Sequence, residues 1–291
     1  MDEQFDIAVI GGGPAGLSAA INGLIRGSRV FLLDAGGSML VRAERIDNYL
    51  GMPGLNGQEM MAGFREHALR LGVEIEKGRA TNVLPVGEQW MISFGSKVAS
   101  AKAVVLATGI AREKSVEGEE AYLGKGLSYC ATCDGMLYRG KNAVVYGTAG
   151  DAPEEANYLA EIGVRVIYVS PGERPEGLKP DIEWRRGSLS AIRGEEKVSA
   201  VALKGLPDQE IETEGVFILR ETLAPQSMVS GLQMAEGYIA VDKDQRTNLP
   251  GLYACGDCTG PPLQIANASG DGLKAGQEAA KYVDSLKRDQ G

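Results

Sequence analysis

The strongest constraint on the fold is a glycine-rich turn, Gly11 to Gly16, which follows an apolar run at residues 5–10 and precedes a helical pattern at residues 17–27. A strand, a G-x-G-x-x-G turn and a helix in this order are typical of a βαβ dinucleotide-binding unit. Gly11 permits the tight turn, Gly13 lets the backbone approach a pyrophosphate, and Gly16 lets the helix pack closely on the strand. The start of the helix would supply unpaired N–H groups for the phosphates.

The second strand of this unit, residues 29–33, ends at Asp34. A carboxylate about 20 residues after such a turn is placed to accept hydrogen bonds from the ribose of a dinucleotide. Because turn, helix and acidic residue occur together, the sequence predicts a bound dinucleotide rather than an incidental glycine turn. The predicted contacts in this segment are Gly11, Gly13, Pro14, Ala15, Gly16 and Asp34.

Composition and charge narrow the class of protein. The 291 residues are 44% hydrophobic and 24% charged, as in globular proteins, which excludes a disordered or fibrous chain. The formal net charge is −9 and no long basic run occurs, so we expect no binding to nucleic acid. The N-terminus does not resemble a signal peptide, and no apolar run reaches the roughly 20 residues that span a bilayer. We therefore expect a soluble, cytoplasmic protein that does not bind membranes.

All four cysteines fall into two C-x-x-C pairs, Cys130/Cys133 and Cys255/Cys258. In a reducing compartment such a pair is redox-active, metal-binding or incidental. A zinc site made of both pairs is disfavoured, because zinc ribbons usually separate their pairs by only about 15–20 residues. We expect no metal site. For the second pair we favour small residues that fill space beside Asp257, with a second redox pair as the alternative.

Segments near the C-terminus indicate which dinucleotide is bound. Residues 247–257 (TNLPGLYACGD) resemble the second FAD motif of flavoproteins that contain two dinucleotide-binding domains, and residues 262–268 (PLQIANA) resemble the family segment that borders the isoalloxazine ring. Residues 107–109 (ATG) and 44–54 (ERIDNYLGMPG) match two further family segments. The resemblance implies FAD rather than NAD in the first fold. The additional FAD contacts that it implies are Asn48, Thr108, Gly109, Gly256, Asp257, Gln264, Ile265 and Ala266.

The segment at residues 126–135, GLSYCATCDG, is the most specific in the chain. It resembles the low-molecular-weight thioredoxin reductase family, and this resemblance extends over essentially the whole sequence. It implies that Cys133 faces the flavin, that Cys130 attacks the disulfide of a thioredoxin partner, and that Asp134 donates a proton to a released sulfur. The alternative for Asp134 is a helix cap or a surface carboxylate. The resemblance also implies a homodimer.

The predicted fold is α/β with two Rossmann-like (βαβ) dinucleotide-binding-type domains. The FAD-binding domain is expected to be discontinuous and to comprise residues 1–113 and 245–291. The central domain, residues 114–244, is expected to have an NAD(P)-type fold and to contain the redox C-x-x-C pair.

The second nucleotide turn departs from the family pattern. It reads GTAGDA at residues 147–152, with Ala149 in place of the middle glycine, and a methyl group there obstructs the approach of a pyrophosphate. Where the family has His-Arg-Arg after the next strand, this chain has Ser-Pro-Gly at residues 170–172, followed only by Arg174. The 2′-phosphate of NADPH needs an arginine fork or a comparable charge. The sequence therefore predicts a degenerate nucleotide site.

The electron donor is the main open question. The pattern resembles the ferredoxin-linked flavin thioredoxin reductases, which makes ferredoxin the predicted donor; a deazaflavin or a second FAD are alternatives seen in other relatives. Because ferredoxins are acidic, docking would need a local basic patch, with Arg112 and Lys114 or Arg185 and Arg186 as candidates. Two further hypotheses are use of NADPH or NADH through the degenerate site, and a flavin-linked dithiol oxidase or redox sensor.

Overall fold

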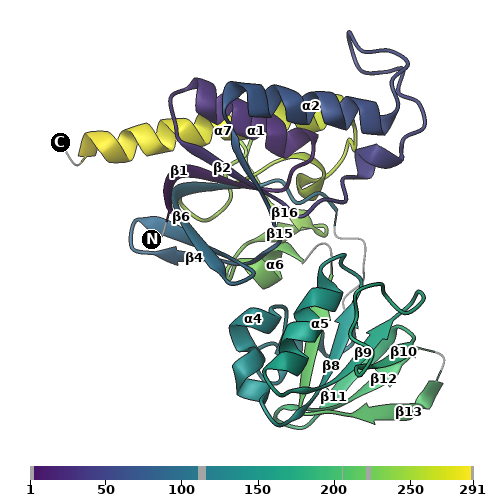
Figure 1. The fold of residues 1–291 in the computed structure, drawn as a ribbon. Coiled ribbons are helices and arrows are strands. Elements are labelled where there is room, and N and C mark those ends of the chain that lie inside the picture. The colour runs from purple at the N-terminus through teal and green to yellow at the C-terminus, as the bar shows by residue number, and fades with distance from the viewer. Residues whose placement is uncertain (1–2, 111–115, 205, 221–223, 290–291) are drawn as a thin grey trace. The chain divides into compact units, whose positions relative to one another are not determined.

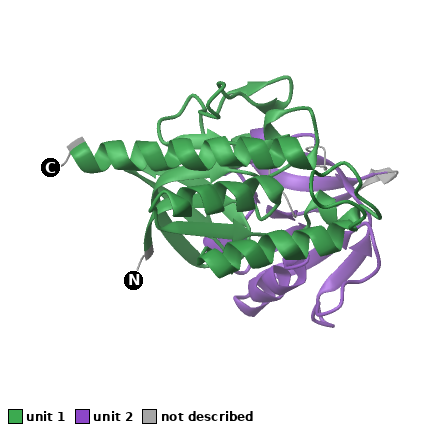
Figure 2. Cartoon of the chain, turned by 90° about the horizontal axis from the view of Figure 1, so that it is seen from above, with its two compact units in different colours: residues 1–112, 222–291 green, residues 113–221 purple. Residues whose placement is uncertain are grey.

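The computed structural model describes residues 3–110, 116–204, 206–220 and 224–289. The chain forms two compact units, shown in green and purple in Figure 2. Unit 1 comprises Met1–Arg112 and Thr222–Gly291, and unit 2 comprises Glu113–Glu221. The predicted α/β class with two dinucleotide-binding-type domains is confirmed.

The second boundary between the units differs from the predicted one. Residues 222–244 were expected in the central domain, but they belong to unit 1. The backbone N–H of Gln233 donates to Oδ1 of Asn248, and Nδ2 of Asn248 donates to the carbonyl of Gly231, both at 2.9 Å. The prediction placed the boundary just before the C-terminal FAD motif, and these long-range hydrogen bonds leave no local signal in the sequence.

Unit 1 is built on a seven-stranded sheet (Figure 1). The strand order is β3-β2-β1-β6-β5-β4, and β17 pairs with the end of β6. Strands β1, β2, β3, β6 and β17 pair in parallel, whereas β4, β5 and the start of β6 form an antiparallel meander. The bounds are β1 (Glu3–Ile10), β2 (Val30–Asp34), β3 (Glu74–Lys77), β4 (Ala80–Val86), β5 (Gln89–Phe94), β6 (Lys97–Leu106) and β17 (Leu252–Ala254).

Three long helices cover one side of this sheet (Figure 1). They are α1 (Pro14–Ile25), α2 (Gly57–Leu71) and α7 (Ile265–Asp289). A capping box starts α2, because Oδ1 of Asn56 accepts from the N–H of Glu59 (3.0 Å) and the carboxylate of Glu59 accepts from the N–H of Asn56 (2.9 Å). The shorter elements of unit 1 are η1 (Met39–Arg42), α6 (Pro225–Met228), β15 (Met234–Ala235), β16 (Tyr238–Ile239) and η3 (Gly256–Thr259).

Helices α1 and α7 touch backbone to backbone. A Cβ at Gly272 would lie 2.1 Å from the carbonyl oxygen of Ala15, and a Cβ at Gly276 would lie 2.2 Å from that of Ala19. Half of the residues in the buried cluster around this contact are alanines, which also permit close packing. The contact therefore brings the first half of α7 against the start of α1.

Unit 2 is built on a five-stranded parallel sheet in the order β10-β9-β8-β14-β7, beside a three-stranded antiparallel sheet, β11-β12-β13. The strands are β7 (Leu127–Ser128), β8 (Asn142–Gly147), β9 (Arg165–Ser170), β10 (Glu183–Arg186), β11 (Leu189–Gly194), β12 (Val198–Leu203), β13 (Leu206–Glu212) and β14 (Gly215–Leu219). The helices are α3 (Glu119–Tyr122), α4 (Ala131–Asp134), η2 (Gly135–Tyr138) and α5 (Ala152–Glu161). Its core packs α5 on the parallel sheet through Ala156, Leu159, Val145 and Phe217.

We predict that Gly272→Ala destabilises the protein by about 1–3 kcal/mol, because the added methyl group must push the backbones of α1 and α7 apart. The matched control is Gly270→Ala, since Gly270 lies on the exposed side of the same helix and a Cβ there meets nothing within 4 Å. The free energy of unfolding of Gly270→Ala should rise by up to about 1 kcal/mol, because alanine has a higher helix propensity than glycine. Urea unfolding of both variants measures the difference, and equal midpoints would contradict the proposed close contact.

Candidate cofactor and disulfide site

The glycine turn of unit 1 joins the carboxyl end of β1 to α1. Gly11 has a φ of +116°, and a Cβ there would lie 2.2 Å from the carbonyl oxygen of Ala107. A Cβ at Gly16 would lie 1.8 Å from the oxygen of Gly11. Both glycines are therefore required by the packing of the turn itself. A Cβ at Gly13 would meet only the hydroxyl of Ser38, at 3.8 Å, so the space beside Gly13 is open to a ligand.

Backbone N–H groups at the start of α1 are available for such a ligand. Among the described residues, no recorded hydrogen bond uses the N–H groups of Gly12, Gly13, Ala15 or Gly16. The first paired amide is that of Leu17, which donates to the carbonyl of Gly13 (2.9 Å). Unpaired N–H groups and the helix dipole together favour an anion such as a pyrophosphate.

Asp34 lies beside this turn, at the end of β2. Its Oδ1 accepts from the N–H of Gly36 (2.8 Å), and its Oδ2 accepts from the guanidinium of Arg65 on α2. A Cβ at Gly12 would lie 2.3 Å from Cγ of Asp34. Each carboxylate oxygen has a second lone pair, so Asp34 can still accept from ribose hydroxyls. The ion pair with Arg65 was missed by the sequence analysis, since only the fold brings α2 to the end of β2.

The C-terminal motif reaches the same edge of the sheet. Strand β17 pairs in parallel with the end of β6, so Gly256 and Thr108 follow neighbouring strand ends. Gly256 has a φ of +75°, and a Cβ there would lie 2.6 Å from Cβ of Ala15. The structure therefore brings together the glycine turn, the segment at residues 108–109 and the segment at residues 256–257.

Asp257 has an acidic neighbour that the sequence analysis did not single out. Burial raises the pKa of Asp257, and the nearby carboxylate of Asp271 adds to this rise. Asp271 accepts from Nε2 of Gln245 (3.1 Å) and from Nδ2 of Asn267 (2.9 Å). The spacing of Asn267 and Asp271, four residues apart on α7, was the available signal. These hydrogen bonds hold Asp271 near Asp257, the residue predicted to contact the ribityl and phosphate part of FAD.

The two side chains expected beside the isoalloxazine ring contact each other. Nδ2 of Asn48 donates to Oε1 of Gln264 at 2.9 Å, although the residues are 216 positions apart. Both side chains are exposed, and Ala266 is exposed as well. Ile265 is half-buried and packs against the buried cluster of Leu40, Ile46 and Met60. Two parts of the sequence that were assigned to the same ring therefore lie together in unit 1.

Cys130 and Cys133 form a disulfide at the start of α4. Sγ of Cys130 accepts from the N–H of Cys133 (3.1 Å) and lies 3.5 Å from the hydroxyl of Thr132. Both donors would stabilise a thiolate on Cys130 after reduction. In the disulfide form Cys130 is only 3% exposed, whereas Cys133 is exposed. The roles predicted for the two sulfurs stay predictions.

Asp134 is held by Ser128. The hydroxyl of Ser128 donates to Oδ2 of Asp134 at 2.6 Å. Asp134 is half-buried, and its side chain makes no capping hydrogen bond to η2. This environment does not fit the alternative of a helix cap or a surface carboxylate.

Cys255 and Cys258 are free thiols buried at the end of β17. The thiol of Cys258 donates to the carbonyl of Cys255 (3.3 Å). Burial raises the pKa of Cys258 to about 11 and raises that of Cys255 well above its ordinary value. Because the thiolate is the reactive form, this geometry favours the space-filling interpretation over a second redox pair. The described part of the chain contains no cluster of three or more His, Cys, Asp or Glu side chains placed to hold a metal ion.

The glycine turn of unit 2 differs from that of unit 1 in its hydrogen bonds. The N–H groups of Thr148 and Ala149 both donate to the carbonyl of Leu219, at 2.9 and 3.0 Å. The N–H of Ala152 donates to the carbonyl of Ala149 (3.1 Å), and the second position of α5 is a proline, which has no N–H. The amides of Thr148, Ala149 and Ala152 are thus engaged within unit 2.

Side chains around this turn are also engaged. The guanidinium of Arg174 donates to the carbonyls of Lys179 (2.6 Å) and Ile182 (3.2 Å). The hydroxyl of Ser170, at the end of β9, accepts from Nε1 of Trp184 (3.0 Å). Arg174 was the basic residue left after β9 by the sequence analysis, and its hydrogen bonds leave it poorly placed for a 2′-phosphate.

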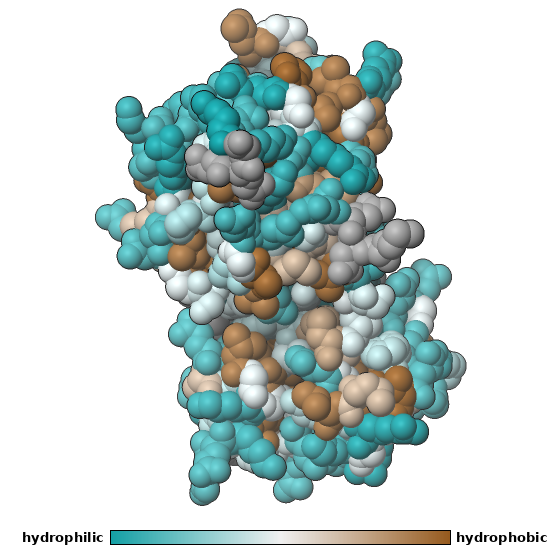
Figure 3. Space-filling model, turned by 90° about the vertical axis from the view of Figure 1, so that its left-hand side faces the viewer, coloured by the Kyte–Doolittle hydropathy of each residue, from teal (hydrophilic) through white to brown (hydrophobic). Residues whose placement is uncertain are grey.

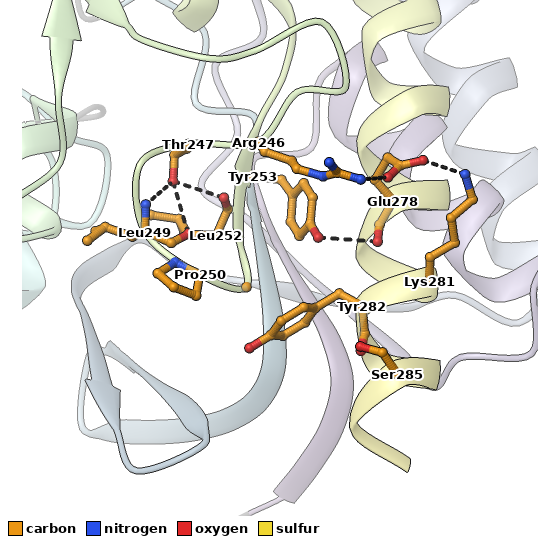
Figure 4. A pocket seen from close by; sticks show the side chains of 11 residues that line it. Arg246, Thr247, Leu249, Pro250, Leu252, Tyr253, Glu278, Lys281, Tyr282 and Ser285 are labelled. Carbon is orange, nitrogen blue, oxygen red and sulfur yellow. Dashed lines mark hydrogen bonds and ion pairs between the residues drawn. The ribbon is translucent and has the colours of Figure 1, made fainter. Parts of the chain in front are cut away.

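A pocket outside the glycine turn lies between the loop at residues 246–253 and the second half of α7 (Figure 4). Its charged side chains pair with one another, because the carboxylate of Glu278 accepts from both Arg246 and Lys281. The pocket lies at the amino end of β17, whereas the predicted cofactor residues lie at its carboxyl end. It is therefore separate from the candidate site.

Comparison with known proteins finds relatives along nearly the whole chain. A thioredoxin reductase from Listeria innocua is 32% identical over 306 residues, which cover 98% of this chain and 96% of the relative. The crystal structure of a ferredoxin-flavin thioredoxin reductase from Clostridium acetobutylicum is 38% identical, with a TM-score of 0.87 and coverage of 99% of this chain and 100% of that chain. The atypical thioredoxin reductase TRi from Desulfovibrio vulgaris Hildenborough is 29% identical, with a TM-score of 0.70 and coverage of 96% and 98%.

An open dinucleotide turn in one unit and a C-x-x-C disulfide in the other define a dithiol–disulfide oxidoreductase. Residues 5–272 match the family described as Pyridine nucleotide-disulphide oxidoreductase. The chain belongs to this family, and within it to the low-molecular-weight thioredoxin reductases. It is an oxidoreductase of the thioredoxin reductase type, with FAD as its cofactor. In the described part of the chain, no helix is both long and apolar enough to cross a membrane.

We predict that Gly13→Ala lowers the affinity for FAD about tenfold or more and leaves the stability of the apoprotein unchanged. Alanine can adopt the backbone angles of Gly13 (φ −77°, ψ −176°) without strain, and a Cβ there contacts almost nothing in the protein. The methyl group therefore obstructs only a bound pyrophosphate. Fluorescence titration of apoprotein with FAD measures the effect, with Gly63→Ala as a control at an unobstructed helical glycine. Wild-type affinity in Gly13→Ala would contradict this placement of the phosphates.

We also predict that iodoacetamide labels two cysteines, not four, in the reduced folded protein at pH 8. With a pKa of about 11, only about one in a thousand Cys258 thiols is ionised at that pH. Labelling of Cys258 should rise only as the pH approaches 11, and both Cys255 and Cys258 should be labelled when urea unfolds the protein. Peptide mass spectrometry identifies the labelled residues. Labelling of Cys258 as fast as Cys133 at pH 8 would contradict the burial argument.

Proposed function

We propose that this chain reduces the disulfide of thioredoxin through FAD and the Cys130/Cys133 pair, with reduced ferredoxin rather than NADPH as the electron donor. The observation that supports the choice of donor is the difference between the two glycine turns. In unit 1 the N–H groups of Gly12 and Gly13 have no hydrogen-bond partner among the described residues, whereas the equivalent N–H groups of unit 2, on Thr148 and Ala149, donate to the carbonyl of Leu219.

The residues of unit 1 fit FAD. The open space at Gly13 and the unpaired amides at the start of α1 suit the pyrophosphate, and Asp34 suits the ribose of the adenosine. Asn48 and Gln264 are exposed and close enough to border the ring system. When bound, FAD supplies a carrier that accepts electrons singly and releases them as a pair.

The chemistry of the protein itself is thiol–disulfide exchange. In the dithiol form, the thiolate of Cys130 attacks one sulfur of the partner disulfide and releases the other sulfur as a thiolate. The thiolate of Cys133 then attacks Cys130 in the mixed disulfide, which restores the Cys130–Cys133 bond and releases the reduced partner. Asp134 is the proposed source of the proton for a released sulfur. Each cycle consumes two electrons and two protons.

The surface next to the disulfide supports a protein substrate. Met136 is 57% exposed and Leu137 is 67% exposed, directly after α4. On the face shown in Figure 3, several hydrophobic residues (brown) lie at the surface among hydrophilic ones (teal). Exposed apolar side chains beside a reactive group commonly mark an interaction site. The thioredoxin reductases among the relatives act, by name, on such a partner.

Ferredoxin is energetically suited to this reaction. Plant-type ferredoxins have potentials near −400 mV and thioredoxin near −270 mV, so about 6 kcal/mol is available for each electron pair. The similar protein from Clostridium acetobutylicum is named a ferredoxin-flavin thioredoxin reductase. Of the basic residues considered for docking, Arg185 pairs with Glu183, and Arg112 and Lys114 lie outside the described residues.

The competing donor is NADPH, because the matched family is named for pyridine nucleotides. Loss of two charge-assisted hydrogen bonds to a 2′-phosphate, at about 1.5–3 kcal/mol each, would weaken NADPH by about 100-fold or more. The interactions of Arg174 and Ala149 leave neither a free guanidinium nor a free amide at these positions for that ligand.

The test is anaerobic mixing of the FAD-loaded protein with NADPH, NADH or photochemically reduced ferredoxin, followed by addition of oxidised thioredoxin. We expect ferredoxin to bleach the visible flavin absorbance and to generate thiols on thioredoxin, with no comparable bleaching by either pyridine nucleotide. Rapid bleaching by NADPH would overturn the proposed donor and leave the disulfide chemistry intact.

A Cys133→Ser variant is the control for the disulfide. It should keep FAD and still be bleached by reduced ferredoxin, but it should form no thiols on thioredoxin. Thioredoxin reduction at the wild-type rate by this variant would exclude the assigned role of the Cys130/Cys133 pair. Oxygen consumption with a dithiol, in the absence of thioredoxin reduction, would instead favour an oxidase.

A further inference from the structure

The hydroxyl of Ser128 lies between Asp134 and the backbone of Cys130. It is 2.6 Å from Oδ2 of Asp134 and 3.2 Å from the carbonyl oxygen of Cys130, and it accepts from the N–H of Cys130 at 3.1 Å. Ser128 is only 4% exposed. Water therefore does not compete strongly for these hydrogen bonds.

This hydroxyl has one proton and faces two acceptors. A serine hydroxyl donates one hydrogen bond and can accept two. When Asp134 is ionised, Ser128 can donate to its carboxylate. When Asp134 is protonated, Ser128 can accept from it and donate to the carbonyl of Cys130 instead. Both protonation states of Asp134 can thus be hydrogen-bonded without movement of a heavy atom.

We propose that Ser128 is a positioning residue that keeps Asp134 oriented in both protonation states during opening and closing of the Cys130–Cys133 disulfide. The proposal rests on the role of Asp134 in the proposed function. When a thiolate attacks one sulfur of this disulfide, the S–S bond breaks and the other sulfur leaves as a thiolate. Asp134 gives its proton to the leaving sulfur, and the hydroxyl of Ser128 turns from Cys130 to the new carboxylate.

Other ionisable groups lie close to α4 and η2. Burial and the charge of Asp134 raise the pKa of Tyr138 on η2. From α5, the carboxylate of Glu155 accepts from the N–H of Ala131 (2.9 Å), and the ring of Tyr158 lies near Gly135. Among the described residues, Ser128 is the only side chain with a recorded hydrogen bond to the carboxylate of Asp134. Ser128 is therefore the residue through which the orientation of Asp134 can be tested.

The test is the rate at which dithiothreitol opens the Cys130–Cys133 disulfide in the FAD-loaded protein, followed by thiol trapping and mass spectrometry between pH 5 and pH 9. The rate for each variant is divided by the wild-type rate at the same pH. This ratio removes the effect of pH on the ionisation of dithiothreitol itself. We expect Asp134→Asn to be slower by about 100-fold and Ser128→Ala by about tenfold near neutral pH. Ser128→Thr, which restores a hydroxyl, should stay within about threefold of the wild type.

A double variant separates positioning from a general structural role. If Ser128 acts through Asp134, Ser128→Ala should cause no further slowing when Asp134 is already Asn. Ser190→Ala, which removes a hydroxyl bonded to the carbonyl of Ala202, is the control within unit 2.

Two results would overturn the proposal. One is a wild-type rate and pH profile for Ser128→Ala. The other is an equal slowing by Ser128→Ala in the presence and absence of the Asp134 carboxylate. Neither depends on thioredoxin or on ferredoxin, so a failure of the proposed electron donor or partner would be recognised separately, by the absence of thioredoxin reduction in the wild type.

Discussion

The close approach of α1 and α7 is the contact on which the cofactor site depends. Gly272 and Gly276 lack the Cβ atoms that would strike the backbone of α1, and β17 extends the same sheet beside β6. These two contacts place the C-terminal segment at residues 256–266 next to the N-terminal glycine turn. Without them, the residues that suit the phosphates and those that suit the ring system would not share one site.

The two glycine turns show how similar local folds can differ in the hydrogen bonds of their backbone amides. Each turn links a parallel strand to a helix, but their N–H groups have different partners. In unit 1 the amides around Gly13 have no recorded partner, whereas in unit 2 the amides of Thr148 and Ala149 bind Leu219. An amide that already donates to a carbonyl has little to gain from a phosphate, because a ligand must first displace that bond. Which amides of such a turn are paired within the protein thus depends on neighbouring strands as well as on its glycines.

Around the disulfide, short-range hydrogen bonds link the sulfur chemistry to a carboxylate. The N–H of Cys133 and the hydroxyl of Thr132 lie near Sγ of Cys130, and Ser128 joins Asp134 to the Cys130 backbone. All of these residues lie within seven positions of one another. The local sequence can therefore encode this arrangement, although its burial depends on the packing of unit 2.

The sequence alone determined the α/β class, the first glycine turn, the C-x-x-C pair and the departure of the second turn from the glycine pattern, because each is a local pattern of residue types. It also suggested that Asn48 and Gln264 border the same ring, but only by resemblance to a family. Tertiary structure decided the ion pair of Asp34 with Arg65, the assignment of residues 222–244 to unit 1, and the closure of the second turn on Leu219. These features depend on pairings between distant segments, and the energy of such pairings is fixed by packing and strand order rather than by any pattern along the chain.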